Sequence, residues 1–254
     1  MRAYLAFTKK EFTESFRTYK LVIMLAVFLL FGIMNPLFAK LTPALLESMA
    51  TDGMVISISE PTAMDSWTQF FKNVGQMGIL VLAILFAGIM ANEFSRGTLV
   101  NILTKGMKRH TVILSKFTAA SVIWTLSYFL CLAVTYGYTA YFWENTGLHH
   151  VFLAFFSPWV FGILLIVLLI LGGTLFKTFS GSLLLCGGAV VVMFLLNIAP
   201  KAQKYNPVTL IGDNMALLAD IKSASDFIPA LVICAVLIVV LVAASVVVFN
   251  KKQV

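Results

Sequence analysis

Long apolar stretches alternate with short polar ones along the whole chain. Six of these stretches are close to or longer than the roughly 20 apolar residues that a helix needs to cross the hydrocarbon core of a bilayer. The third is long enough to tilt or to extend into water. The pattern predicts an all-α membrane protein with six transmembrane helices, over residues 21–39, 73–91, 112–142, 155–176, 182–198 and 228–249.

The composition favours the same class of protein. The chain is 60% hydrophobic and 11% charged, whereas a soluble domain is about 45–50% apolar and about 25% charged. The six spans use so much of the 254 residues that no loop is long enough to hold a second folded domain. We therefore expect residues 1–254 to form a single membrane domain.

Positive charges are distributed unevenly between the two sides that the spans define. Of the 18 Lys and Arg residues, 13 fall in the N-terminal segment, in or beside the loops after the second and fourth spans, or near the C-terminus. Eight of the 11 acidic residues fall in the opposite loops. Because Lys and Arg are enriched in cytoplasmic loops, we expect a multi-pass protein of the cytoplasmic (inner) cell membrane with both termini in the cytoplasm.

Polar segments with their own patterns flank the spans. Residues 1–20 place Leu5, Phe12 and Phe16 at helical spacing, with basic residues on other faces. This predicts an amphipathic helix in the cytoplasmic interface, where its cations meet anionic lipid headgroups. Residues 40–68 and 199–227 are the long outer loops, and the apolar content of the second loop predicts short helices that dip into the outer leaflet.

The cytoplasmic loop at residues 92–111 predicts a short helix of its own. Gly97 breaks the chain, Thr98 can cap the helix, and Gly106 ends it. An apolar stripe with i, i+3, i+4 spacing follows one face of this helix, formed by Leu99, Ile102 and Leu103. The stripe is suited to a groove on a soluble partner, and it is equally suited to a helix that rests on the lipid surface.

The chain has no motif for catalysis. The GxxxxGK[ST] phosphate loop is missing from the sequence. The histidines lie at the edges of spans, and Ser180 and Ser182 have no histidine placed to activate them. The three cysteines lie in apolar runs without the spacing of metal ligands. We therefore expect neither catalytic residues nor a metal site.

The loop at residues 92–111 resembles the matching loop of type-2 ABC transporter permeases. In that family the second span ends at a Glu, followed by Gly-Thr-Leu, a Leu-Leu stretch, a Pro, an Arg and later a Lys. The matching positions here are Glu93, Gly97-Thr98-Leu99, Ile102-Leu103, Gly106 in place of the Pro, Arg109 and Lys116. The layout is also similar: six spans, cytoplasmic termini, an N-terminal amphipathic helix and a semi-apolar loop before the last span.

The resemblance implies the permease subunit of an ABC exporter. Its partners would be a second permease copy or paralogue and a separate ABC ATPase subunit, which would bind ATP and Mg²⁺, so no cofactor is expected on this chain. Nucleic acid is not an expected partner. The helix in the loop would be the coupling helix, and the N-terminal helix would brace the ATPase. The implied ATPase contacts are Glu93, Arg96, Gly97, Thr98, Leu99, Ile102, Leu103 and Arg109.

Aromatic residues concentrate in the third span. A belt at the membrane interface explains those near its outer end, and a transport path lined by amphipathic rings is the functional alternative. The candidate path residues are Trp124, Tyr128 and Tyr136 in this span and Asn197 in the fifth. Because the spans carry no clear ionisable residue, we expect an amphipathic peptide, an antibiotic or a lipid-like molecule as cargo.

Two other functions are compatible with such a chain. One is an ATP-independent secondary carrier or channel, although such carriers usually keep an ionisable residue inside the membrane as the coupling group. The other is a non-transporting membrane scaffold or immunity protein. An ATPase subunit that accompanies the chain distinguishes the exporter from both.

Overall fold

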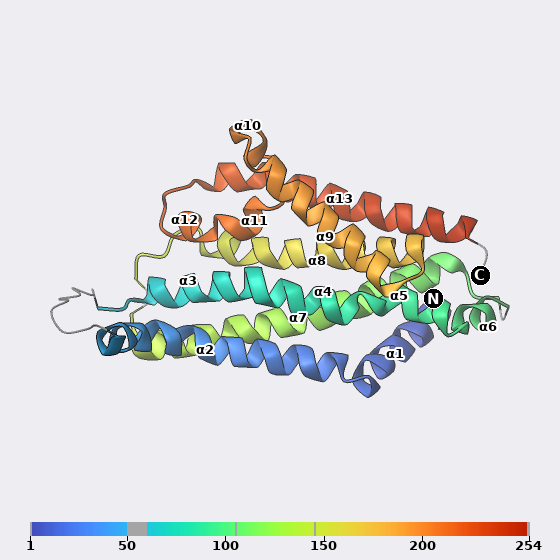
Figure 1. The fold of residues 1–254 in the computed structure, drawn as a ribbon, viewed down its shortest axis with the longest axis horizontal. Helices are drawn as coiled ribbons and strands as arrows, with labels where there is room; N and C mark the ends of the chain where they lie inside the picture. The colour runs from blue at the N-terminus through green and yellow to red at the C-terminus, as the bar shows by residue number, and fades with distance from the viewer. Residues whose placement is uncertain (1, 50–59, 105, 145, 253–254) are drawn as a thin grey trace.

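A computed structural model describes residues 2–49, 60–104, 106–144 and 146–252. The elements are α1 (Arg2–Arg17), α2 (Lys20–Met49), α3 (Ala63–Asn73), the π-helix η1 (Val74–Gly78), α4 (Ile79–Phe86), α5 (Gly88–Ser95), α6 (Thr98–Thr104), α7 (Arg109–Phe142), α8 (Val151–Phe176), α9 (Phe179–Leu196), α10 (Pro200–Gln203), α11 (Thr209–Gly212), α12 (Asn214–Leu218) and α13 (Ala224–Lys251). All of these elements are helical (Figure 1).

Six helical segments in the described part of the chain are long and apolar enough to cross a membrane. They are Lys20–Leu45, Ala63–Ser95, Arg109–Phe142, Val151–Phe176, Phe179–Leu196 and Ala224–Lys251. They lie roughly alongside one another as an elongated bundle (Figure 1). The predicted all-α membrane fold and its six spans are therefore confirmed.

The second span is longer than predicted because its first turns are polar in sequence but buried in the fold. It begins at Ala63, ten residues before the predicted start. Thr62 and Asp65 form a capping box, in which the Thr62 backbone N–H donates to Asp65 Oδ2 over 2.8 Å. Trp67 and Phe70 are fully buried. Polar residues between these aromatics interrupt the apolar run, so hydropathy alone did not include this segment.

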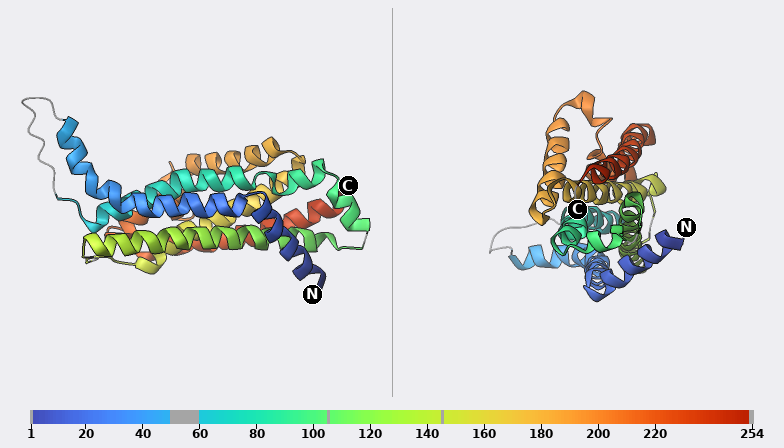
Figure 2. Two further views of the ribbon diagram at one scale, coloured as in Figure 1. Left: turned by 90° about the horizontal axis from the view of Figure 1, so that it is seen from below. Right: turned by 90° about the vertical axis from the view of Figure 1, so that its right-hand side faces the viewer.

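The first span also extends beyond its predicted end. α2 continues to Met49 through Pro36 and Pro43, and Pro43 falls within the predicted outer loop. Proline removes a helical hydrogen bond and bends a helix, and the end of α2 turns away from the bundle (Figure 2). The predicted outer loop at 40–68 is therefore shorter, and its residues 50–59 lie outside the described part of the chain.

Helix α8 forms the centre of the bundle. It packs against α13, α9, α7, α5 and α4 and also against α11 and α12, and most of its side chains are buried. Its buried hydroxyls are satisfied locally: Ser157 and Thr174 each donate to a backbone carbonyl four residues earlier over 2.7 Å. α9 and α13 keep broad apolar faces on the outside, which suits contact with lipid tails.

The segment at 199–227 contains the predicted short helices, α10 to α12, and leucines of α11 and α12 point inward. Leu210, Leu217 and Leu218 are fully buried. The Asn214 amide donates to the Ala154 carbonyl of α8 over 3.0 Å. Packing on α8 thus buries these apolar residues of α11 and α12 within the protein, and their depth in the outer leaflet stays a prediction.

Candidate coupling site at the basic end of the bundle

One end of the bundle, which we call the basic end, gathers the segments that carry most of the positive charge. Figure 1 shows α1, α6 and both chain ends at this end. The short connection between α8 and α9 lies there too, since these two helices run in opposite directions from it. The arrangement agrees with an even number of spans, which places both ends of the chain on one side of the membrane.

The short helix of the loop is present as α6, framed by two glycines. Gly97 has φ +64° and Gly106 has φ +83°, and only glycine adopts this left-handed region without strain. An added Cβ would find no atom within 4 Å at either position. Glycine is therefore required at these two positions because of its backbone conformation, and not because a side chain would clash. The two residues set where α6 begins and ends.

The apolar stripe of α6 packs partly on its own chain. Leu99 is fully buried in the core and Leu103 packs against it. The side chain of Ile102 lies outside the described part of the structure. Arg96 is exposed, and Val100 is 43% exposed. Burial of Leu99 makes it a support for α6, so the exposed surface at α6 is on the side of Arg96 and Val100.

Glu93 connects the end of the second span to the start of α6. Its carboxylate accepts a short hydrogen bond from the Thr98 hydroxyl through Oε2, and its backbone carbonyl accepts from the same hydroxyl over 3.3 Å. Glu93 itself is buried, at 4% exposure. The first residue of α6 is thereby tied to a charged group inside the protein.

Lys116 lies between two carboxylates in the interior. Its Nζ is 2.9 Å from Glu93 Oε1 and 2.9 Å from Glu11 Oε2, and its side chain is only 2% exposed. Glu11 comes from α1, Glu93 from α5 and Lys116 from α7. A buried ion must be paired to be tolerated, so these three residues hold the three helices together.

Lys10 and Glu14 extend the cluster toward the surface. Lys10 Nζ is 2.7 Å from Glu93 Oε1, 2.6 Å from Glu14 Oε2 and 3.1 Å from Glu11 Oε1. Burial on its own would lower the pKa of Lys10, but the hydrogen bonds to Glu14 and Glu93 and the charge of Glu11 outweigh it, so the pKa is raised above its ordinary value. Lys10 therefore stays protonated at neutral pH.

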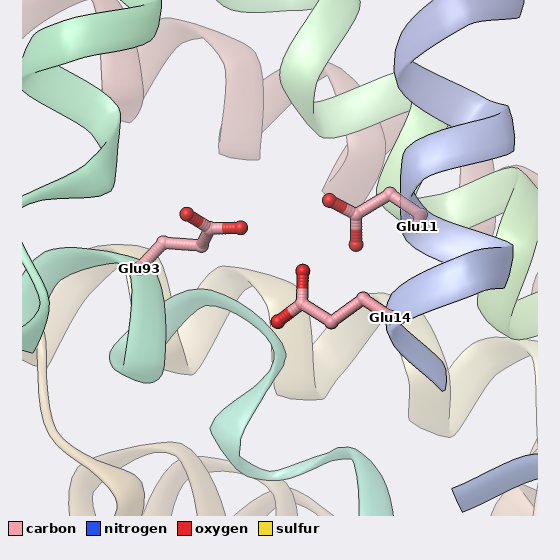
Figure 3. A group of neighbouring side chains, drawn as sticks. All are labelled: Glu11, Glu14 and Glu93. Carbon is pink, nitrogen blue, oxygen red and sulfur yellow. The ribbon is translucent and has the colours of Figure 1, made fainter. Parts of the chain in front are cut away.

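Figure 3 shows the three carboxylates of Glu11, Glu14 and Glu93 facing one another from α1 and α5. One carboxylate oxygen of each lies within 4.8 Å of the others, a spacing that could hold a cation. Lys10 and Lys116 already make ion pairs with this group. The cluster is therefore an ion-pair network that joins α1, α5 and α7, which we call the charge cluster.

Sequence reasoning missed the role of α1 in this cluster. The predicted apolar stripe of α1 faces outward in part, since Leu5 and Phe16 are 64% and 62% exposed. The face toward the bundle carries Phe7 and Glu11, which are buried and four residues apart. In the sequence, the signal for this buried face is a glutamate, Glu11, one helical turn after the aromatic Phe7.

The expectation that the spans carry no clear ionisable residue is also wrong. Glu93 and Lys116 lie within the helices of the second and third spans, near their ends at the basic end. In the sequence, Lys116 stands out only as a match to the family pattern, because a single lysine at the edge of an apolar run gives no sign of its partners. The two carboxylates that neutralise it come from elsewhere in the chain.

Arg109, an implied ATPase contact, is engaged within the chain. Its guanidinium donates to the backbone carbonyls of Phe249, Asn250 and Lys252 at the end of α13, the last over 2.6 Å, and lies 5.3 Å from the centre of the Phe249 ring. Cations are favourable at the carboxyl end of a helix. Arg109 therefore fastens the last span to the start of α7.

The predicted path residues do not gather in one place. Trp124 and Tyr128 are fully buried, and each donates to a backbone carbonyl of α8, Trp159 over 3.0 Å and Phe155 over 2.5 Å. In this structure they serve packing between α7 and α8.

The two remaining path candidates differ from this pair. Tyr136 is 56% exposed. Asn197 follows α9, where its side-chain oxygen accepts from Asn206 over 3.3 Å. A path role for any of the four residues stays a prediction.

Comparison with known proteins places the chain in a family. The family model described as "ABC-2 family transporter protein" matches residues 5–254, nearly the whole chain. A curated relative, "Uncharacterized transmembrane protein YxlG" of Bacillus subtilis (strain 168), is 23% identical over 216 residues, which cover 83% of each chain. The six spans agree with this match, and the chain belongs to the ABC-2 transporter family as a membrane-spanning permease subunit of an ABC transporter.

Proposed function

We propose that the chain is the permease of an exporter driven by a separate ABC ATPase subunit that binds at the basic end. The observation that carries this proposal is the contact between α6 and the charge cluster. Thr98 begins α6 and bonds to Glu93, and Glu93 shares Lys116 with Glu11. A push on the exposed side of α6 would therefore reach α1, α5 and α7 together.

The length of α7 suits it to carry such a movement across the membrane. Its 34 residues correspond to about 50 Å of helix, more than the thickness of the hydrocarbon core. Lys116 lies two turns from its first residue. Because a helix moves largely as a rigid element, a displacement at Lys116 would reorient the whole third span and change the packing at the far end.

The basic end would face the cytoplasm in this proposal. The uneven distribution of Lys and Arg supports that orientation, and so does the location of the ATPase, which needs cytoplasmic ATP. The exposed Leu5 and Phe16 of α1, and Tyr19 just after it, would then lie in the lipid interface. The side of α1 toward the bundle would brace the loop that contacts the ATPase.

We further propose a dimer with a second permease copy or paralogue and an amphipathic peptide, antibiotic or lipid-like cargo that moves outward. The family supports the dimer and the outward direction. Support for the cargo comes from the apolar composition of the spans and from the position of the charge cluster, which lies at one end of the bundle and away from its middle.

The same position argues against an ion-coupled carrier. Carriers usually bind their coupling ion near the midplane of the membrane, at an ionisable side chain whose charge the ion can neutralise. Both Glu93 and Lys116 sit near the ends of their spans, and each already has an ion-pair partner. A scaffold role remains the second candidate, and it predicts no bound ATPase.

Co-purification tests the proposal. The chain is isolated gently from its native membrane and the accompanying proteins are identified, beside variants Arg96→Glu and Val100→Asp, which change exposed positions at α6. Ile221→Asp is the matched control, because this apolar side chain is 78% exposed and lies after α12 at the opposite end. An ATPase that accompanies the parent and the control, and is lost from the α6 variants, supports the proposal. A parent chain that arrives without an ATPase contradicts it.

A further inference from the structure

A pocket lies at the end of the bundle opposite the charge cluster. Its volume is about 300 Å³, and it is bounded by the second span, the end of α9 and the helices α11 and α12. Apolar side chains form most of its wall, among them Phe71, Phe194 and Ile211. The volume falls at the lower end of the range for small-molecule sites.

Three polar side chains of the second span line one side of this pocket. They are Thr68, Lys72 and Gln76, spaced four residues apart, and Lys72 and Gln76 are exposed at its open side. No carboxylate among the described residues pairs with Lys72 within 4.0 Å. Lys116 at the basic end, by contrast, contacts two carboxylates. The pocket therefore combines apolar walls with a positive charge that the described protein does not neutralise.

The depth of Lys72 places this charge at the level of lipid headgroups. Lys72 and Glu93 are 21 residues apart on the same span, which is about 30 Å of helix and equals one hydrocarbon thickness. Glu93 lies at the basic end, so Lys72 lies near the opposite face of the hydrocarbon core. The walls beside it are then within reach of an acyl chain.

The backbone keeps the pocket open beside this lysine. The π-helix η1 follows directly after Asn73, and such local widening of a helix is frequent at functional sites. Gly75 lies in η1 and lines the pocket, and a Cβ added there would lie 3.6 Å from the Ile211 carbonyl oxygen. A methyl group would fit, whereas a larger side chain would fill the space between η1 and α11.

We infer that this pocket binds an anionic amphiphile, a lipid-like molecule with one negatively charged headgroup. The Lys72 ammonium would pair with the headgroup, the Gln76 amide would donate to one of its oxygens, and Phe71, Phe194 and Ile211 would contact the apolar chain. Binding here does not require transport or an ATPase, so its test is independent of the proposed function.

A binding measurement on the purified chain in neutral detergent tests the inference. The probe is a dansyl-labelled fatty acid, with its uncharged methyl ester as the matched ligand. Lys72→Gln should weaken binding of the acid by about tenfold, the value of a charge-assisted contact, and leave the ester unchanged. Lys72→Arg should keep binding of the acid. Lys201→Gln, which removes a cation outside the pocket, should change neither.

Filling the pocket gives a second, charge-independent readout. Gly75→Leu should weaken both the acid and the ester, whereas Gly75→Ala should keep both, and thermal unfolding checks that each variant is folded. Lysophosphatidylglycerol should displace the acid from the parent, and lysophosphatidylcholine should not. Equal binding of the acid by the parent and Lys72→Gln would overturn the inference, and so would full binding by a folded Gly75→Leu.

Discussion

Lys116 and Glu93 form a buried ion pair, with Lys116 Nζ 2.9 Å from Glu93 Oε1 and side chains that are 2% and 5% exposed. The pair joins the start of the third span to the end of the second. Glu11 binds the same lysine and adds the N-terminal helix. A movement of α6 that displaced Glu93 would therefore act on two spans and on α1 at once.

Removal of Lys116 should destabilise the protein strongly. In Lys116→Met two buried carboxylates lose their shared partner, and breaking a buried ion pair from one side costs about 3–5 kcal/mol. Because Lys10 still contacts both Glu93 and Glu11, we expect the lower part of that range. Chemical unfolding in detergent measures the change.

A double-mutant cycle separates this pairing from packing. Glu11→Gln on the parent should be destabilising, but on the Lys116→Met background it should cost much less, because the carboxylate no longer has its buried partner. Equal costs on both backgrounds would contradict the description of Glu11 and Lys116 as a coupled pair.

The charge on Lys10 gives the cluster a defined dependence on pH. Its pKa is raised above the ordinary 10.5 in the folded protein. A raised pKa contributes stability that is fully present below 10.5 and is lost as pH rises through the folded pKa. The stability difference between the parent and Lys10→Gln should thus be constant near neutral pH and shrink only in strong alkali. Thermal unfolding across pH measures it, and a difference that shrinks near neutral pH would contradict the assignment.

Arg109 should control the order of the chain's last turn. In Arg109→Gln the carbonyls of Phe249 and Lys252 lose a charged donor, worth about 1.5–3 kcal/mol. We expect faster amide hydrogen exchange at the end of α13. Lys108→Gln is the control, because this exposed neighbour lies outside that contact. Unchanged exchange in Arg109→Gln would show that the end of α13 is held by other contacts.

Gly162 should not tolerate a methyl group. A Cβ added there would lie 2.3 Å from Trp124 Cε2, so Gly162→Ala must displace the Trp124 ring from its hydrogen bond to α8. Overpacking of this kind costs about 1–3 kcal/mol. Gly188→Ala is the matched control, because no atom lies within 4 Å of its added Cβ, and it should be neutral or stabilising. Equal unfolding temperatures for the two variants would contradict the packed position of Trp124.

The sequence predicted those features that depend on local pattern. Sustained apolar runs determine the spans, and Gly97 and Gly106 frame α6 because their backbone conformations are set within a few residues. Features that depend on distant partners were not predictable in the same way. Glu11 becomes buried only because Lys116, 105 positions away, meets it. Trp67, among polar neighbours, belongs to a span only because Phe155 packs on its ring, with centroids 4.7 Å apart.

We propose that the charge cluster transmits movement from α6 to the far end of the third span. An environment-sensitive fluorophore on Tyr141→Cys tests it, because Tyr141 is 82% exposed near the far end of α7 and the native cysteines are buried. The labelled chain, in complex with its ATPase, receives ATP. We expect a change of emission in the parent and none in Glu11→Gln with the ATPase still bound. The same change in both proteins would contradict the claim.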